Sequence, residues 1–498
     1  MRRVWIGFIT LPLLAAAVPQ RAAAEGEPET EFRAYWVDAF HNGFKTPAQA
    51  DQLITDIRKS GANAVIVQVR RRGDAYFNKA LEPRTEDPAL APGFDALAYL
   101  IEKAHTASLR IEVHAWLATL PIWNSATPPI AKEHVFNRHG PTAQGRDYWL
   151  MDRVDGVNRS GADYLLDPGH PDAVDYTVEQ YLNVVRRYPV DGIHLDLVRY
   201  MGPEWGYNPV SLERFREQTG FSGTPDPQDE IWKEWRRRQV DHLMRKVYLK
   251  AIAIRPQVKV SAAVIAWRQG PSFMEEYRRS APYTEVLQDW NAWLKEGIID
   301  LAIPMNYDRE HVPDQKRWYD QWIGWEKDHQ YHRQIVAGPG IYLNSIDGSL
   351  NQIKRTRAPS TAGNRLAGVG LYSYAVTNKD NESSDLFFRR LRETLFQLPA
   401  VVPEMPWKNR PEKGFLRGKV VSIAGNPLDG AEMELRHKGR KVRLTADGSG
   451  FFGTAELEPG FYTLRLDKQW GYTPVRPLFI RPGGNTEIKV RVIPIRND

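Results

Sequence analysis

A short segment of the chain, residues 190–200, brings a carboxylate, a guanidinium and a phenol to the end of an apolar run. If this segment is a strand, alternate side chains share a face, so His194 and Asp196 point to one side and the apolar residues between them to the other. Ionisable side chains on the inward face of a buried strand cost free energy. We therefore interpret Asp196, with Arg199 and Tyr200 just beyond it, as part of a functional site.

Polar and aromatic side chains also stand at or near the ends of the other strand-like runs. They are Asp38, Gln68, Arg70, Glu112, His114, Trp116, Trp267, Asn306, Tyr307, Asp308, Tyr342, Tyr372 and Tyr374. In a barrel of parallel strands these ends meet at one rim, so side chains far apart in the sequence converge. A rim of carboxylates and aromatic rings, in a chain without cysteine, favours glycoside hydrolysis.

Glycoside hydrolysis by acid/base catalysis normally uses two carboxyl groups. We assign the general acid to Asp196, because burial at the mouth of a barrel raises the pKa of a carboxyl group. The second carboxylate is Asp308, Glu112 or Asp38, with Asp308 placed first, and the sequence does not choose among them. On a substrate with an N-acetyl group, the acetamido oxygen can replace the second carboxylate, and Tyr307 could then hydrogen-bond to it.

The predicted substrate-binding side chains share this rim. They are Asp38, Arg70, His114, Trp116, His194, Arg199, Tyr200, Trp267, Asn306, Tyr307 and Tyr372. Arg70 and Arg199 carry the planar guanidinium that suits a carboxylated sugar, the alternative being charge balance for the rim carboxylates. For His114 and His194 the alternative is a hydrogen-bonded structural role. The sequence has no paired-histidine zinc motif, P-loop or serine triad pattern, so we predict no metal and no cofactor.

The elements that would position these residues alternate between β-rich runs and amphipathic helical stretches over residues 31–398. The expected strands are 32–38, 64–70, 110–116, 190–197, 259–266, 300–306, 334–340 and 368–374, with helices such as 48–60, 94–107, 172–187 and 285–295. Eight such units predict an α/β fold of the (β/α)8 TIM-barrel type. Two long loops, 117–168 and 202–230, suit either a cleft for an extended polymer or plain surface insertions.

The two ends of the chain differ from the barrel region. Residues 1–24 have the features of a cleaved secretory signal, so we expect cleavage after Ala24 and a secreted or periplasmic protein without a membrane span. No cysteine is present to carry a lipid anchor or a disulfide, and the formal charge of +6 includes three signal-peptide arginines, so no nucleic-acid partner is implied. After a Pro-rich linker at 399–413, short strands at 417–423, 431–436, 460–466 and 486–492 predict a small antiparallel β-sandwich over 414–496.

Several motifs resemble those of a known family. Residues 68–76, 111–116, 166–171, 190–196, 290–297 and 304–307 look like the motifs of the bacterial glycosyl hydrolase-like 10 family, in the right order between 31 and 397. The resemblance implies an exported (β/α)8 barrel that acts on a bacterial glycan, including peptidoglycan strands stripped of their peptides. The C-terminal region resembles carboxypeptidase-regulatory-like sandwich modules, for which contact with an envelope glycan is one role.

A more distant similarity, to chitinases of glycoside hydrolase family 18, bears on the mechanism. Residues 191–198 and 305–308 can be laid over two chitinase motifs, and Val198 then stands where the chitinases place their acid glutamate. We therefore expect hydrolysis of O-glycosidic bonds in a bacterial polysaccharide to depend on Asp196. A non-catalytic glycan-binding barrel of the cell envelope is the alternative, because the glutamate position is not filled.

Overall fold

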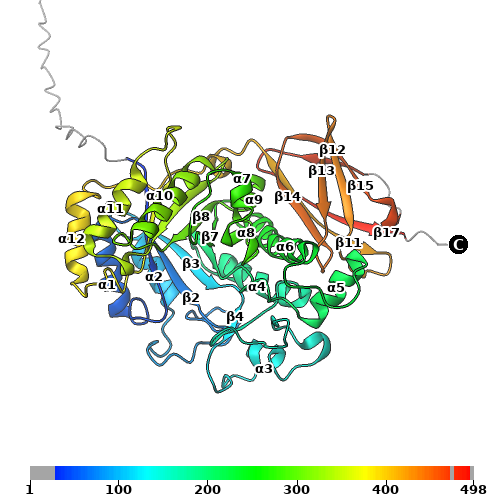
Figure 1. Ribbon diagram of the computed structural model, residues 1–498, viewed down its shortest axis with the longest axis horizontal. Coiled ribbons are helices and arrows are strands. Elements are labelled where there is room, and N and C mark those ends of the chain that lie inside the picture. The colour runs from blue at the N-terminus through cyan, green and yellow to red at the C-terminus, as the bar shows by residue number, and fades with distance from the viewer. Residues whose placement is uncertain (1–28, 472–475, 494–498) are drawn as a thin grey trace, which may run out of the picture.

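The computed structural model describes residues 29–471 and 476–493, so the expected signal peptide and its cleavage site lie outside the described residues. Eight parallel strands close into a barrel in the order β1-β10-β9-β8-β7-β6-β3-β2 (Figure 1). They are β1 (Phe32–Val37), β2 (Ala64–Arg70), β3 (Glu112–Ala118), β6 (Gly192–Asp196), β7 (Lys259–Ile265), β8 (Leu301–Asn306), β9 (Gln334–Pro339) and β10 (Gly368–Tyr372). All eight expected strands are present, and the predicted (β/α)8 barrel is confirmed.

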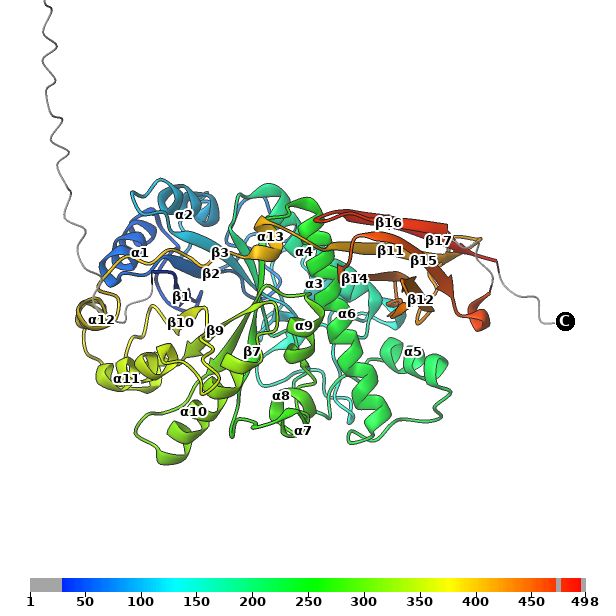
Figure 2. The ribbon, with the colours of Figure 1, turned by 90° about the horizontal axis from the view of Figure 1, so that it is seen from above.

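Helices surround the barrel as its outer layer (Figure 2). They include α1 (Pro47–Ser60), α2 (Ala96–His105), α4 (Pro171–Arg187), α6 (Glu230–Ile254), α9 (Trp290–Glu296), α10 (Pro313–Asp328), α11 (Ile346–Arg357) and α12 (Ser384–Thr394). At the start of α1 the Thr46 hydroxyl accepts a hydrogen bond from the Gln49 amide at 3.2 Å, and Gly61 ends the helix with a φ of 78°. The helix expected at 285–295 begins only at Trp290, because Asp289 caps it there.

The two long loops carry small elements of their own. After β3, the strands β4 (Pro121–Trp123) and β5 (Tyr164–Leu165) pair with each other. The remaining short elements of the barrel region are α3 (Val135–His139), η1 (Gly145–Asp147), α5 (Pro209–Thr219), α7 (Met274–Tyr277), α8 (Ala281–Thr284) and η2 (Ile341–Leu343). These elements follow the carboxyl ends of strands, which is where barrel enzymes build their clefts.

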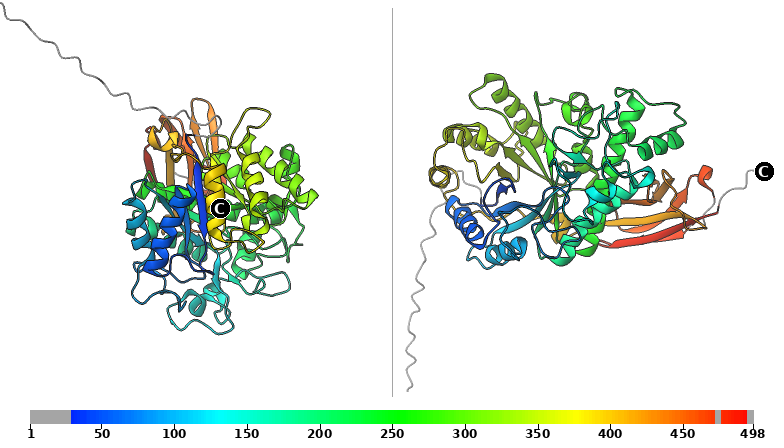
Figure 3. Two further views of the ribbon diagram at one scale, coloured as in Figure 1. Left: turned by 90° about the vertical axis from the view of Figure 1, so that its left-hand side faces the viewer. Right: turned by 90° about the horizontal axis from the view of Figure 1, so that it is seen from below.

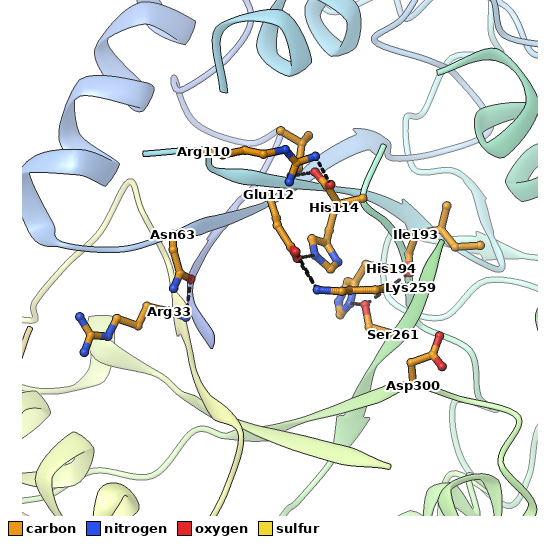
Figure 4. A network of polar contacts seen from close by, with 12 residues as sticks. Arg33, Asn63, Arg110, Glu112, His114, Ile193, His194, Lys259, Ser261 and Asp300 are labelled. Atoms are coloured by element: carbon orange, nitrogen blue, oxygen red, sulfur yellow. Dashed lines mark hydrogen bonds and ion pairs between the residues drawn. The ribbon is translucent and has the colours of Figure 1, made fainter. Parts of the chain in front are cut away.

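Inside the barrel, an apolar middle layer separates two polar regions. Apolar side chains of β1, β2 and β8, among them Phe32, Ile66 and Ile303, pack against one another there. At the amino-terminal end, the Lys259 ammonium donates to both oxygens of Glu112 at 2.7 and 2.8 Å, as Figure 4 shows. This buried ion pair lies at the end of the barrel opposite to the rim on which the predicted site depends, because both residues begin their strands.

The Pro-rich segment at 399–413 is ordered against the amino-terminal end of the barrel. Val402, Met405 and Trp407 pack onto the apolar side chains inside the barrel. The Trp407 indole donates to one carboxylate oxygen of Asp300 at 2.7 Å, and the Lys408 ammonium lies 3.0 Å from the other. This segment, which includes α13 (Pro406–Asn409), therefore forms a floor to the barrel as well as a connection to the next domain.

The C-terminal region forms two small sheets, β14-β11-β17 and β13-β12-β15-β16. The strands are β11 (Gly414–Ser422), β12 (Glu432–His437), β13 (Arg440–Thr445), β14 (Phe451–Leu457), β15 (Gly460–Leu466), β16 (Arg476–Ile480) and β17 (Asn485–Val492), with η3 (Lys468–Trp470) before β16. The all-β sandwich is confirmed. The expected antiparallel arrangement is wrong for one pair of strands. The first strand of the domain, β11, and the last one, β17, pair with each other in parallel.

The sandwich lies against the helices α5 and α6 of the barrel (Figures 2 and 3). Its Phe415, Phe451 and Ala455 belong to the same hydrophobic cluster as the barrel's outer core. Two barrel cations also reach it: Arg214 donates to both oxygens of Asp429 at 2.6 and 2.8 Å, and Lys246 donates to Asp447 at 2.8 Å. The sandwich therefore has a core of its own and is joined to the barrel by an apolar contact and by these ion pairs. Within the described residues, no helix is both long enough and apolar enough to cross a lipid bilayer.

Candidate active site

A cavity of about 320 Å³ opens at the carboxyl ends of the barrel strands. It is lined by aromatic rings, two carboxyl groups and two guanidinium groups: Trp36, Phe40, Gln68, Arg71, Trp116, Ala118, Pro121, Asn124, Asp163, Asp196, Leu197, Arg199, Ala263, Met305, Tyr307, Tyr342 and Tyr372. Of the predicted site residues, the structure brings Trp116, Asp196, Arg199, Tyr307 and Tyr372 together here.

Asp196 is the last residue of β6 and projects into this cavity. One carboxylate oxygen accepts a hydrogen bond from the Trp116 indole at 3.1 Å, and the other accepts one from the Leu197 amide at 2.7 Å. Leu197 has a φ of 54°, so the chain turns sharply where the strand ends. Burial raises the pKa of Asp196, although the positive charge of Arg199 and these two hydrogen bonds oppose the rise. A carboxyl group in this setting can hold a proton closer to neutral pH than a free aspartic acid can.

Aromatic rings from β1, from β10 and from the turn after β8 form one wall of the cavity. The Tyr307 and Tyr372 rings stack with centroids 5.3 Å apart, and the Trp36 ring meets Tyr372 edge-on at 6.0 Å. Burial raises the pKa of Tyr307 well above its usual value, and the negative charge of Asp196 adds to the rise. Tyr307 is therefore a neutral hydrogen-bond donor near Asp196 throughout the physiological pH range.

His194 lies beneath this wall, inside the barrel, and does not line the cavity. Its Nε2 accepts a hydrogen bond from the Trp36 indole at 3.1 Å. Its Nδ1 lies 2.9 Å from the Ser261 hydroxyl, as Figure 4 shows. Burial lowers the pKa of His194 well below its usual value, so the ring is neutral. A neutral ring that accepts at Nε2 carries its proton on Nδ1 and donates it to Ser261. His194 thus holds Trp36 in place.

Asp163 is a cavity residue that the sequence did not reveal. It lies in the long loop after β3, just before β5, and its carboxyl group is half-buried beside Asn124. Burial raises the pKa of Asp163, while a hydrogen bond from Asn124 and the positive charges of Arg71 and Arg159 oppose the rise. No strand or helix period marks this position, so only the three-dimensional fold of the loop could show it.

Asp308 and Asn306, both predicted at the rim, face away from the cavity. The Asn306 amide donates to Glu326 on α10 at 2.8 Å. The Asp308 carboxyl group is buried behind β8, where burial raises its pKa to about 7, and its backbone carbonyl accepts from Asn344 and Gln352. The backbone turns after Asn306 and directs Tyr307, instead of Asp308, into the cavity.

Glu112 and His114 do point into the barrel, but at its amino-terminal end. His114 Nε2 lies 3.1 Å from the Glu112 carboxylate, which also pairs with Lys259, so neither side chain reaches the cavity. Gly192 leaves room for the His114 ring, because a Cβ at that position would overlap with it. The expectation that Glu112 could be the second carboxylate is therefore wrong. Glu112 faces the barrel interior, but it begins β3 and so lies at the amino-terminal end of the barrel, away from the cavity.

Arg70 and Tyr200 are buried elsewhere. Arg70 donates to both oxygens of Glu82 at 2.7 and 2.8 Å and does not line the cavity. The pairing of β2 with β3 shifts register between Gln68 and Arg70, which turns Arg71 into the cavity in its place. Tyr200 is fully buried against Gly206, behind the cavity.

Asp38 and Trp267 lie beside the cavity without lining it. One Asp38 oxygen accepts hydrogen bonds from the amides of Phe40 and His41 at 2.9 and 3.0 Å, which fixes the loop that presents Phe40. The Trp267 ring is partly exposed and lies under the Arg199 guanidinium, whose central carbon is 5.3 Å from the ring centroid. Within residues 29–471 and 476–493, no group of three or more His, Asp or Glu side chains could hold a metal ion.

A closed (β/α)8 barrel with carboxyl groups and aromatic rings around a cavity at the carboxyl ends of its strands defines a barrel enzyme of the glycoside hydrolase class. Residues 31–355 match the model of the Glycosyl hydrolase-like 10 family, and the chain belongs to that family.

Curated relatives agree with this assignment, and a solved structure has a similar fold. The chain is 26% identical over 433 residues to glycosyl hydrolase YngK of Bacillus subtilis (strain 168), covering 81% of this chain and 80% of YngK. It is 27% identical over 268 residues to glycosyl hydrolase DigH of Escherichia coli (strain K12), covering 52% of this chain and 57% of DigH. The fold resembles that of the PgaB (BpsB) glycoside hydrolase domain from Bordetella bronchiseptica, with a TM-score of 0.53 and 16% identity over 73% of this chain and 98% of that domain.

Proposed function

We propose that this chain hydrolyses O-glycosidic bonds in a bacterial cell-envelope polysaccharide, with peptide-free peptidoglycan strands as its substrate and Asp196 as the general acid. The observation that carries the proposal is the half-buried Asp196 carboxyl group, which lies in a cavity walled by aromatic rings and has a raised pKa. A protonated carboxyl group at this position donates its proton to the glycosidic oxygen as the bond to the anomeric carbon breaks.

Asp163 supplies the second carboxylate in this proposal, in place of Asp308 and Glu112. Together with Asp196 it provides the carboxyl groups among the described residues that line the cavity. Burial raises the pKa of Asp163, whereas the hydrogen bond from Asn124 and the positive charges of Arg71 and Arg159 oppose that rise. Its ionised form is the one that would activate water or attack the anomeric carbon. Water adds its hydroxyl to the anomeric carbon in the completed reaction, and its remaining proton restores the acid.

The setting in which the enzyme works is also part of the proposal. The predicted signal at residues 1–24 places the mature protein in the periplasm or outside the cell. The sandwich contacts envelope glycan through its outer sheet, where the rings of Phe461 and Phe479 are exposed and lie 4.8 Å apart. Flat exposed rings of this kind suit stacking on sugar faces.

The experiment is the release of reducing ends from peptide-free glycan strands by the purified protein. Asp196→Asn keeps the shape of the side chain and one of its two hydrogen-bond acceptors but removes the acid, so we expect a loss of turnover of about 10²–10⁴-fold with glycan binding retained. Asp163→Asn should cause a comparable loss, whereas Asp308→Asn, behind β8, tests the discarded assignment.

Each outcome has a distinct meaning. Equal release of reducing ends by wild type and Asp196→Asn would contradict the assignment of the acid. Absence of release by both, with binding intact, would favour the glycan-binding barrel. Activity lost in Asp308→Asn and kept in Asp163→Asn would contradict our choice of the second carboxylate, and activity kept in both would favour catalysis by an N-acetyl group of the substrate.

A further inference from the structure

Arg199 is a buried cation in the active-site cavity that forms no ion pair within residues 29–471 and 476–493. The side chain lines the cavity and is only 8% exposed. Its hydrogen bonds within the described residues are long ones, to the Tyr200 carbonyl at 3.4 Å and to the Met201 sulfur at 3.7 Å. Arg199 forms no ion pair with any carboxylate of the described chain, since Asp196 influences it only from beyond 4 Å.

This situation is unusual within the molecule. The other buried arginines of the described chain are each paired with a carboxylate, except Arg236, which donates to the carbonyl oxygens of Pro203 and Trp205. A buried guanidinium without a partner costs free energy, because its five N–H donors need hydrogen-bond acceptors. A residue that the fold leaves in this state is suited to receive its partner from outside.

The surroundings of Arg199 indicate what that partner is. The guanidinium lies over the exposed Trp267 ring, which offers a flat surface for a sugar. Arg71, which also lines the cavity, likewise has no ion-pair partner among the described residues; it lies 4.3 Å over the Phe40 ring. Two unpaired arginines that each stack on an aromatic ring favour a glycan with a planar anionic substituent, which a guanidinium binds through two parallel hydrogen bonds.

We propose that Arg199 is the receptor for a carboxylate carried by the sugar substrate, so that the enzyme selects acidic over neutral glycans. This inference rests on the proposed function for its cavity, and it names the substrate class that the cavity accepts. In this role Arg199 determines specificity by touching the substrate, whereas Asp196 carries the proton transfer.

The test compares glycans that differ only in charge. Binding of peptide-free glycan strands is measured by calorimetry against the same strands with their carboxyl groups converted to methylamides, using the Asp196→Asn protein so that nothing is cleaved. We expect the free carboxylate to bind about ten- to a hundredfold more tightly. Adding Arg199→Gln should reduce the ratio of the two affinities, carboxylate over methylamide, to within about twofold. Arg199→Lys should give a ratio between those of the parent protein and Arg199→Gln, because an ammonium cannot form the paired hydrogen bonds.

Two controls separate this role from a structural one. Arg317→Gln, on the exposed face of α10, removes an arginine that pairs only with Asp314 and should leave the ratio unchanged. Arg199→Gln should keep or raise the thermal midpoint, since it leaves no carboxylate unpaired. A fall of more than about 5 °C would assign Arg199 to the stability of the fold and overturn the proposal.

The remaining outcomes also decide. A ratio near one in the parent protein, a ratio that survives Arg199→Gln, or no binding of the carboxylated strands would each overturn the proposal. A hyaluronan hexamer carries its carboxylates directly on a sugar ring. If it binds more tightly than the peptide-free strands, the carboxylate that Arg199 receives belongs to a uronic acid. Retained selectivity without release of reducing ends by wild type would refute the hydrolase function and leave the carboxylate receptor standing.

Discussion

Asp447→Asn is the substitution that most directly tests whether the sandwich is an integral part of the enzyme. Asp447 is buried at the domain boundary; one oxygen accepts from the Ser449 and Phe451 amides at 2.8 and 2.9 Å, and the other accepts from Lys246 at 2.8 Å. An asparagine can keep the first set of bonds. Its amide group then faces the buried Lys246 ammonium, which retains Asp175 and Ser449 as partners.

The magnitude follows from the pKa of this group. Burial by itself would raise the pKa of Asp447, but the charge of Lys246 and the hydrogen bonds outweigh it and hold the pKa at about 2, below its ordinary 3.8. At about 1.4 kcal/mol for each pH unit, the ionised form contributes about 2.5 kcal/mol at neutral pH. Leaving Lys246 underpaired adds to this, and we expect Asp447→Asn to lower the free energy of unfolding by about 3 kcal/mol.

The assay is urea unfolding at pH 7, followed by tryptophan fluorescence and circular dichroism. The matched control is Glu487→Gln, which breaks an exposed pair with Arg417 on the sandwich and should cost less than about 0.5 kcal/mol. Because the folded-state pKa is depressed, the stabilisation is present above about pH 4 and is lost as the pH falls toward 2, so the two proteins should converge in acid. A loss no larger than the control's, or a separate early transition of the sandwich with an unchanged barrel midpoint, would refute the reasoning.

Two further predictions concern buried groups near the site. Burial raises the pKa of Glu326 to about 8, so the folded protein loses stability as the pH rises from about 4.5 to 8. Glu326→Gln keeps an acceptor for the Asn306 amide and should be more stable than wild type by about 2–4 kcal/mol at pH 8.5. Urea unfolding should show this difference at pH 8.5 and no difference at pH 4. His194→Leu leaves the Trp36 indole without a partner and removes the donor to the Ser261 hydroxyl, so it should cost about 2–4 kcal/mol and raise KM, whereas His194→Gln should cost less. Equal stability of wild type and His194→Leu would contradict the role of His194 in holding Trp36.

The barrel could be predicted from the sequence because its signals are local and repeated. Each of the eight strands is a short apolar run followed by a helix with its own end signals, such as Thr46 and Gly61 around α1. Alternation along β6 also placed His194 and Asp196 on the inner face, where the structure has them. The antiparallel sandwich was predicted only in part, since the parallel pairing of β11 with β17 depends on contacts between the two ends of the domain.

The site was harder to predict, for reasons that differ from residue to residue. Alternation tells which face of a strand a side chain occupies but not how far along the barrel it lies, so Glu112 was assigned to the wrong end. Because the register shifts in β2, Arg71 lines the cavity and Arg70 does not. The turn after Asn306 directs Tyr307 into the cavity and Asp308 away from it. Asp163 comes from a loop without any period, so its position depends on the folding of the whole insertion.

The Pro-rich floor of the barrel has a consequence for how the protein is made. Residues 399–401 pair with the start of the chain: the Glu31 amide donates to the Val401 carbonyl, and the Val401 amide donates to the Glu29 carbonyl, each at 2.9 Å. During synthesis β1 can pair with β2 early, but its other edge stays open until β10 and then Val401 leave the ribosome. A nascent chain that has not reached β10 therefore exposes an unpaired edge, and a fragment cut before Trp407 leaves the apolar mouth of the barrel open; both features promote aggregation. The smallest fragment that can fold as a barrel must extend past residue 408, and binding of a chaperone before that point should protect the growing chain.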